Sequence, residues 1–137
     1  MQVREERTGW RDEALSRRHR RWGWDCPAVD IDFLMIEYDR GKALALVEYK
    51  NEHAPEQHSS HPTYQAMIDL GNRAGIPVVA CRYSSDWSTW TATPLNAEAR
   101  RWFPQRIVLT ERGWVTMLYR LRGGFVPFGL FDGDTLA

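Results

Sequence analysis

The sequence has no long apolar run and very little cysteine. No segment approaches the roughly 20 apolar residues that a membrane-spanning helix needs. The stretch from Met1 to Arg21 is charged, with no apolar core after it, which argues against a secretory signal peptide. Cys26 and Cys81 are the only two cysteines, and neither belongs to a CxxC pair. We therefore expect reduced thiols in a cytoplasmic protein and not a disulfide scaffold.

Net charge is also absent, because 18 basic side chains balance 18 acidic ones. A protein that binds nucleic acid through its overall charge would be strongly basic. The distribution is uneven, since the segment from Arg4 to Arg21 contains seven Arg and four acids, and suits either a solvated helix face or phosphate contact. Lysine is nearly missing, because Lys42 and Lys50 are the only two, so each is a candidate for a specific role.

What remains is the make-up of one globular domain. The 137 residues are 43% hydrophobic, which allows a buried core without disulfides or metals to stabilise it. We expect a single domain over residues 1–137, with a core at about 4–83 and a C-terminal hairpin and tail over 104–137. No internal repeat or low-complexity segment is present.

Hydrophobic periodicity and turn residues predict alternating helices and strands. The predicted elements of the first part are a helix (Arg4–Trp22), a β-hairpin (Ala28–Tyr38 and Ala43–Tyr49) and a helix opened by Pro62 and closed by Gly75. Those of the second part are a central strand (Ile76–Tyr83), a polar loop (Ser84–Thr93), a short helix capped by Asn96, and strands Arg106–Thr110 and Trp114–Leu121. This order predicts an α/β or α+β domain with a mixed central sheet flanked by helices.

Charged residues gather at one end of the predicted hairpin. Alternation along the strands places Asp30 and Asp32 on one face of the first strand, and Glu48 and Lys50 on one face of the second. A turn near 40–41 brings these strand ends together. Because the strands are otherwise apolar, such charges must be paired or bound to a metal.

Two or three acids beside an amine suit hydrolysis that depends on magnesium. Mg²⁺ prefers carboxylate oxygens and water as ligands, and a neighbouring Lys can position or deprotonate the attacking water. The pattern therefore predicts hydrolysis of a phosphodiester bond. The alternative is a surface ion pair on an edge strand.

These residues resemble the PD-(D/E)XK nuclease superfamily, which has the restriction-endonuclease-like fold and includes Holliday junction resolvases. The family pattern is an acid at the head of one strand, a hairpin, and Glu-x-Lys on the next strand. Here it corresponds to Asp32 and Glu48-Tyr49-Lys50. The resemblance covers roughly Arg4–Tyr83 and implies an αβββαβ-type core. Ile31 precedes the acid where the family pattern has Pro, and Asp30 competes with Asp32 for the motif position.

The resemblance implies a role for each residue. Asp32 or Asp30, Glu48 and the carbonyl of Tyr49 would bind Mg²⁺, for which Mn²⁺ would substitute, and Lys50 would act on the water. On the flanking helices, Glu13, or Glu6 as the alternative, would support the metal site, and Gln65 would lie near the scissile phosphate.

The resemblance also implies a substrate, which is DNA. The protein would be an endonuclease that acts as a homodimer, as a monomeric nickase or as a subunit of a larger phage or defence complex. One alternative is a catalytically inactive nucleic-acid-binding or structural module with the same fold, and another is an interaction protein that is not a nuclease.

Three further sets of side chains have a possible chemical role. Three histidines in one polar loop, with either cysteine, form an alternative zinc set without the usual paired spacing; a solvated loop is the simpler interpretation. Two tryptophans in a polar segment either stack on bases or pack on the core, and scattered arginines are candidates to extend a phosphate-binding surface. The histidines are His53, His58 and His61, the tryptophans are Trp87 and Trp90, and the arginines are Arg82, Arg100, Arg101 and Arg106.

Overall fold

The structure is a computed structural model, and it describes residues 13–23, 31–56 and 60–131. The chain divides into two compact units, Met1–Asp30 and Ile31–Ala137. In the first unit, α1 (Glu13–Arg21) is a short helix with Glu13 in its first turn and basic residues in its last. The predicted helix over Arg4–Trp22 is thus confirmed from Glu13 onward, and residues 4–12 lie outside the described residues.

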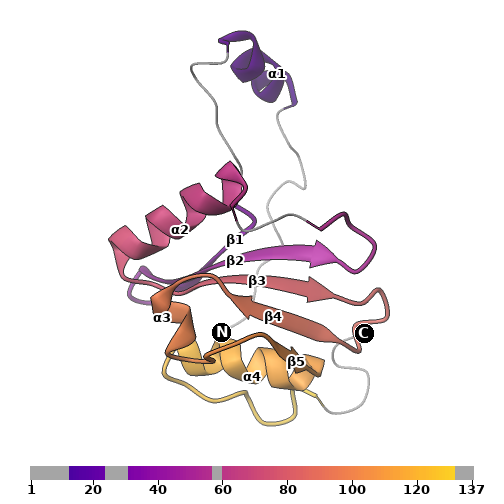
Figure 1. Cartoon of the computed structure of the whole chain (residues 1–137). Coiled ribbons are helices and arrows are strands. Elements are labelled where there is room, and N and C mark those ends of the chain that lie inside the picture. Colours follow the sequence, from indigo (N-terminus) through magenta and orange to yellow (C-terminus); the bar gives the residue numbers. More distant parts are fainter. Residues whose placement is uncertain (1–12, 24–30, 57–59, 132–137) are drawn as a thin grey trace. The chain divides into compact units, whose positions relative to one another are not determined.

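The second unit is built on a mixed sheet whose five strands lie in the order β1-β2-β3-β4-β5 (Figure 1). Strands β2 and β3 are parallel because helix α2 crosses between them, and the other neighbours are antiparallel. The mixed sheet and the central place of the third strand are therefore confirmed. The strands are β1 (Phe33–Glu37), β2 (Lys42–Asn51), β3 (Val78–Tyr83), β4 (Trp90–Pro94) and β5 (Ile107–Leu109).

The predicted hairpin is formed by β1 and β2. Gly41 has the left-handed backbone that a tight turn requires, with φ 60°. The carboxylate of Glu37 accepts a hydrogen bond from the backbone N–H of Arg40 at 2.8 Å, which closes the turn. Phe33 pairs with Val47, so Asp32, which precedes β1, comes next to Glu48. Strand β1 begins at Phe33, later than predicted, and residues 28–30 lie outside the described residues.

One face of the sheet is covered by α2 (Pro62–Ala74), which begins and ends where the sequence predicts. The His61 side chain accepts a hydrogen bond from the Thr63 N–H at the N-terminus, and Gly75 ends the helix with φ 71°. Met67 of α2 packs on Leu46 and Val78, and Gly71 comes so close to the sheet that a Cβ would collide with Val78. The helix therefore covers the Leu46 end of β2.

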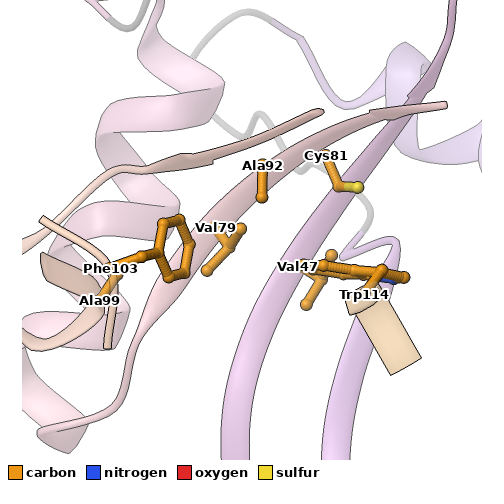
Figure 2. Close-up of a cluster of buried hydrophobic side chains, with 7 residues drawn as sticks. All are labelled: Val47, Val79, Cys81, Ala92, Ala99, Phe103 and Trp114. Carbon is orange, nitrogen blue, oxygen red and sulfur yellow. The ribbon is translucent and has the colours of Figure 1, made fainter. Parts of the chain in front are cut away.

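The opposite face carries the larger core cluster, shown in Figure 2. Helices α3 (Ala97–Arg100) and α4 (Glu111–Leu121) contribute to it. Asn96 caps α3 as predicted, because its Oδ1 accepts a hydrogen bond from the Ala99 N–H at 2.9 Å. The buried residues of the cluster are Val47, Val79, Cys81, Ala92, Ala99, Phe103 and Trp114.

Two predictions for the C-terminal part are wrong. The segment Trp114–Leu121 is not a strand but most of α4, and the turn expected at 111–113 is the first turn of that helix, capped by the Thr110 hydroxyl. No C-terminal hairpin is formed by the described part of 104–137. The loop predicted over Ser84–Thr93 ends early, because β4 begins at Trp90 and pairs with a strand on each side.

No helix in the described part of the chain is long and apolar enough to cross a bilayer.

Candidate active site

The hairpin brings Asp32, Glu48 and Lys50 together. Asp32 Oδ2 accepts a hydrogen bond from the backbone N–H of Tyr49 at 3.3 Å, so the acid before β1 is joined to the Glu-x-Lys segment of β2. Lys50 Nζ lies 3.5 Å from Glu48 Oε1 on the same face of that strand. Alternation along β2 places the Tyr49 side chain on the other face, among the aromatic residues packed on the core cluster. The grouping expected from the sequence is therefore present.

Glu48 is a buried acid, and its surroundings make its negative charge unfavourable. Its side chain is buried, with 9% exposed, and burial raises its pKa above the ordinary value. The negative charge of Asp32 raises that pKa further, while the ammonium of Lys50 lowers it. Burial and the neighbouring carboxylate thus make ionisation of Glu48 less favourable than that of a solvated glutamate.

Glu48 also has an oxygen without a partner. Its Oε2 is buried and accepts no hydrogen bond within the described parts of the chain. A buried carboxylate oxygen without a donor is costly, and a native example calls for an ion or a water to explain it. A divalent cation between Asp32 and Glu48 would satisfy this oxygen and relieve the repulsion between the two carboxylates.

The donor set fits magnesium better than zinc. Within residues 13–23, 31–56 and 60–131, no three His, Cys, Asp or Glu side chains gather as a metal group. Two carboxylates are nevertheless enough for Mg²⁺, which keeps several waters and completes its shell with substrate phosphate. Asp30, the alternative motif acid, lies outside the described residues.

A polar cleft of ≈ 460 Å³ adjoins Lys50 on this face of the sheet. In the register of the sheet Lys50 lies opposite Arg82, and Arg82 lies opposite Thr91, so basic and hydroxyl side chains follow one another across three strands. Such groups are suited to contact phosphate oxygens. The cleft is lined by Lys50, Glu56, Tyr64, Ala80, Cys81, Arg82, Thr91, Thr93, Leu95 and Arg106.

Arg82 has a structural task as well as a charge. Its Nη1 donates hydrogen bonds to the carbonyl oxygens of Asn51, Glu52 and Ala54, at 3.0–3.1 Å. These bonds tie the loop after β2 to β3 and thereby fix one wall of the cleft. The guanidinium keeps its positive charge while it does so.

Sequence reasoning missed two contributions to the cleft. Tyr64 of α2 is buried but also lines the cleft, and its pKa is raised by burial and then by the charge of Glu48. Thr91 and Thr93 were assigned to a loop, and β4 instead points both into the cleft. Alternation of Thr with apolar residues in WTATP was the available signal.

Two of the remaining predicted site residues, Glu13 and Gln65, are on helices. Glu13 begins α1 in the first unit, and its support of the metal site stays a prediction. Gln65 is exposed on α2 and does not line the cleft. Among the basic candidates, Arg106 lines the cleft, whereas Arg100 and Arg101 do not.

The alternative zinc set is not assembled by its described members. His53 Nε2 lies 3.4 Å from Glu52, and His61 Nδ1 accepts a hydrogen bond at the N-terminus of α2. Cys81 is buried in the core, where burial raises the pKa of its thiol to about 12. His58 and Cys26 lie outside the described residues.

In comparisons with known proteins, no family model, no curated protein and no solved structure matches this chain. The chemistry of the site therefore has to follow from its own residues: a pair of carboxylates, a lysine beside them and a polar cleft.

Proposed function

We propose that this protein is a magnesium-dependent nuclease of the PD-(D/E)XK type, which hydrolyses phosphodiester bonds of DNA. The observation that carries the proposal is the buried, unpartnered Oε2 of Glu48 between a second carboxylate and a lysine. A metal bound there would supply the partner that this oxygen lacks among the described residues, and it would offset the repulsion between the carboxylates of Glu48 and Asp32.

Asp32 and Glu48 would bind the metal, together with the carbonyl of Tyr49 and, as the alternative acid, Asp30. Bound Mg²⁺, or Mn²⁺ in its place, supplies a water of lowered pKa and offsets negative charge on the phosphate. The hydrogen bond from the Tyr49 N–H keeps Asp32 turned toward β2, so the two carboxylates are already side by side before a metal binds.

Lys50 would orient the attacking water. Its side chain is 36% exposed, and its ammonium lies beside Glu48 at the edge of the cleft. From there it would contact both the attacking water and a phosphate oxygen. General acid–base groups of this kind contribute a factor of about 10²–10⁴ to the rate.

The cleft would hold the DNA backbone. Lys50, Arg82 and Arg106 supply positive charge, and Thr91 and Thr93 supply hydroxyl donors, along one face of the sheet. Phosphate contacts need local positive charge, and a chain with zero net charge can provide it in a cleft. The protein would act in the cytoplasm, as a homodimer or as a subunit of a larger complex.

The order of the elements supports the restriction-endonuclease-like core. A helix, a hairpin, a crossover helix and a strand parallel to the second hairpin strand follow one another in the described residues. The αβββαβ core has one strand more before the hairpin than these residues contain. In this proposal the two motif halves and the crossover helix correspond to those of that core.

The test compares the only two lysines of the chain. Plasmid, single-stranded and branched DNA are incubated with Mg²⁺ or Mn²⁺ and with wild type, Lys50→Ala, Asp32→Asn or Lys42→Ala. Lys42 is the control because it is exposed at the far end of the same strand, where it pairs with Glu37. We expect Lys50→Ala and Asp32→Asn to lose cleavage by about 10²–10⁴, and Lys42→Ala to keep it.

Metal binding gives a second readout that does not need the right substrate. Mg²⁺ should raise the Tm of wild type, and Glu48→Gln should remove that increase. Absence of cleavage of every DNA, or equal cleavage by wild type, Lys50→Ala and Asp32→Asn, would overturn the nuclease proposal. DNA binding without cleavage would identify the inactive module of the same fold.

A further inference from the structure

A second cavity, of ≈ 700 Å³, lies on the opposite face of the sheet, where the side chain of Tyr49 points. Its walls are almost entirely apolar and aromatic, and Glu111 at the first turn of α4 is the only ionisable carboxylate among them. Below, this cavity is called the aromatic groove. It is lined by Phe33, Met35, Tyr49, Tyr83, Trp87, Trp90, Glu111, Trp114, Val115 and Leu118.

Three rings of the aromatic groove lie nearly parallel to one another. The centroid of Tyr83 is 5.4 Å from Trp87 and 5.6 Å from Trp90, with interplanar angles of 13° and 29°. Trp87 and Trp90 are 6.0 Å apart at 22°. These three rings therefore stack on one another with offset faces, and part of the Trp87 ring stays open to solvent, because that residue is 53% exposed.

Trp87 has an unfavourable backbone conformation. Trp87 has φ 65°, a left-handed conformation that bulky side chains rarely adopt. Asp86 holds the turn by accepting hydrogen bonds from the hydroxyls of Ser84 and Ser88, both at 2.7 Å. Trp90 Nε1 donates to the Trp87 carbonyl at 2.8 Å. A strained residue whose ring stays half in solvent gains little from core burial, which points to a ligand.

The chemistry of the walls selects a flat ring that carries N–H groups. Aromatic faces favour a planar π-system, and a carboxylate accepts hydrogen bonds from the exocyclic amine of a base. A phosphate would be repelled by Glu111, because no basic side chain is among the described residues that line the aromatic groove, whereas Lys50, Arg82 and Arg106 accompany Glu56 in the cleft. A nucleobase meets both conditions once it is free of its paired partner.

We propose that the aromatic groove binds an unpaired nucleobase of the DNA substrate, which stacks on the exposed part of the Trp87 ring that Tyr83 and Trp90 support. This rests on the proposed nuclease function, and it specifies a substrate with a single-stranded part. The aromatic groove and the candidate active site lie on opposite faces of the sheet at the same ends of β1 and β2. Tyr49 of the groove stands between Glu48 and Lys50 in the sequence, and Phe33 of the groove follows Asp32. A strand that passes this end of the sheet presents phosphate to one face and a base to the other.

The test measures binding without cleavage. Tryptophan fluorescence is titrated in EDTA with single-stranded oligo-deoxyadenosine, with an abasic strand of equal length, and with blunt duplex. Wild type, Trp87→Ala and Trp87→Phe are compared with Trp102→Ala, which removes an exposed tryptophan outside the groove. A circular dichroism spectrum and a Tm for each variant establish that it is folded.

We expect Trp87→Ala to weaken binding of the single strand by about 5- to 150-fold. Trp87→Phe should recover most of that loss because it keeps a stacking ring, and Trp102→Ala should bind as wild type does. The abasic strand should bind wild type and Trp87→Ala alike. Equal binding of the abasic and the base-bearing strand by wild type would overturn the proposal, and so would equal binding of the single strand by Trp87→Ala and Trp102→Ala.

Two additional experiments distinguish this proposal from the nuclease proposal and from binding of a cationic ligand. Lys50→Ala should lose cleavage but keep the Trp87-dependent binding, so failure of the nuclease and failure of the base site give different results. Tetramethylammonium serves as a probe for a cation cage. Saturable quenching by it, abolished in Trp87→Ala, together with no effect of the base on DNA binding, would assign the aromatic groove to a cationic ligand instead.

Discussion

The two faces of the sheet are made from alternate residues of the same strands, yet the helices cover the two faces to different extents. On one face, α4 and α3 pack along Val47, Val79 and Ala92 and bury an extended cluster (Figure 2). On the other face, α2 packs on Leu46 and Val78. Beyond that contact β2 continues with Glu48 and Lys50, and the cleft begins. The comparison shows that the ionisable residues lie where the covering helix stops.

The largest expected effect concerns the aromatic face. Trp114 is 2% exposed in the core cluster, so Trp114→Ala should lower the free energy of unfolding by about 3–5 kcal/mol. Trp102→Ala, at a site that is 46% exposed, should change it by less than about 1 kcal/mol. Denaturant unfolding followed by circular dichroism measures both. Similar losses in the two variants would show that this face does not carry the core.

The next effect concerns the packing of α2 on the polar face. A methyl group at position 71 would collide with Val78, so Gly71→Ala should destabilise the protein by about 1–3 kcal/mol although Ala is the better helix former. Because α2 also carries Tyr64 of the cleft, cleavage should fall as well. Gly124→Ala is the control, since its nearest neighbour would be 3.9 Å from the new Cβ. A more stable Gly71→Ala would mean that α2 packs less closely than described.

A smaller effect concerns Tyr49, whose hydroxyl lies on the aromatic face and whose carbonyl belongs to the candidate active site. The Tyr49 hydroxyl accepts a hydrogen bond from Trp114 Nε1 at 3.0 Å, so Tyr49→Phe should cost about 1 kcal/mol of stability. Cleavage should be unchanged, because only the carbonyl of this residue would contact the metal. Thermal unfolding and the plasmid assay are compared on one preparation. A loss of activity that exceeds the loss of folded protein would show that the faces are coupled.

The smallest effect is the pH dependence contributed by Glu48. The pKa of its folded form is raised above the ordinary value of 4.5, so the folded state binds more protons than the unfolded state between the two values. Stability from this group is therefore lost as pH rises through that interval. In EDTA, Glu48→Gln should gain on wild type in Tm from acidic to neutral pH.

Added Mg²⁺ should reverse that order at neutral pH, because the proposed metal site consists of the ionised carboxylates of wild type. Parallel Tm curves for wild type and Glu48→Gln, with and without Mg²⁺, would contradict the electrostatic account of the site.

The parts of the fold that the sequence predicted are those set by short-range patterns. Alternation along β2 separates Glu48 and Lys50 from Tyr49, and the turn before Lys42 determines which residues face each other. Helix α4 was missed because Trp114–Leu121 is rich in aromatic and β-branched residues, which favour strands when taken alone. Thr110 with Glu111 was the helix-start signal, and the four-residue spacing of Trp114 and Leu118 the confirming one.

The cleft and the aromatic groove were beyond such patterns. Each is formed by side chains from β2, β3 and β4 together with a helix or loop, and β4 was partly assigned to a loop. Tyr64 shows a further reason, since a tyrosine on the inner face of a helix reads as core even where its side chain borders polar space. Tertiary neighbours decide its role, and a local pattern does not contain them.

The two hydrogen bonds of Tyr49 also imply an order of assembly. Its backbone N–H reaches Asp32 across 17 residues, whereas its hydroxyl reaches Trp114 across 65. Closing the shorter loop costs less chain entropy, so we expect the hairpin to form before α4 docks. The two carboxylates then meet on a nascent hairpin, with the aromatic face still open to water. Their repulsion opposes an early folding step, and a divalent cation present during synthesis would speed it.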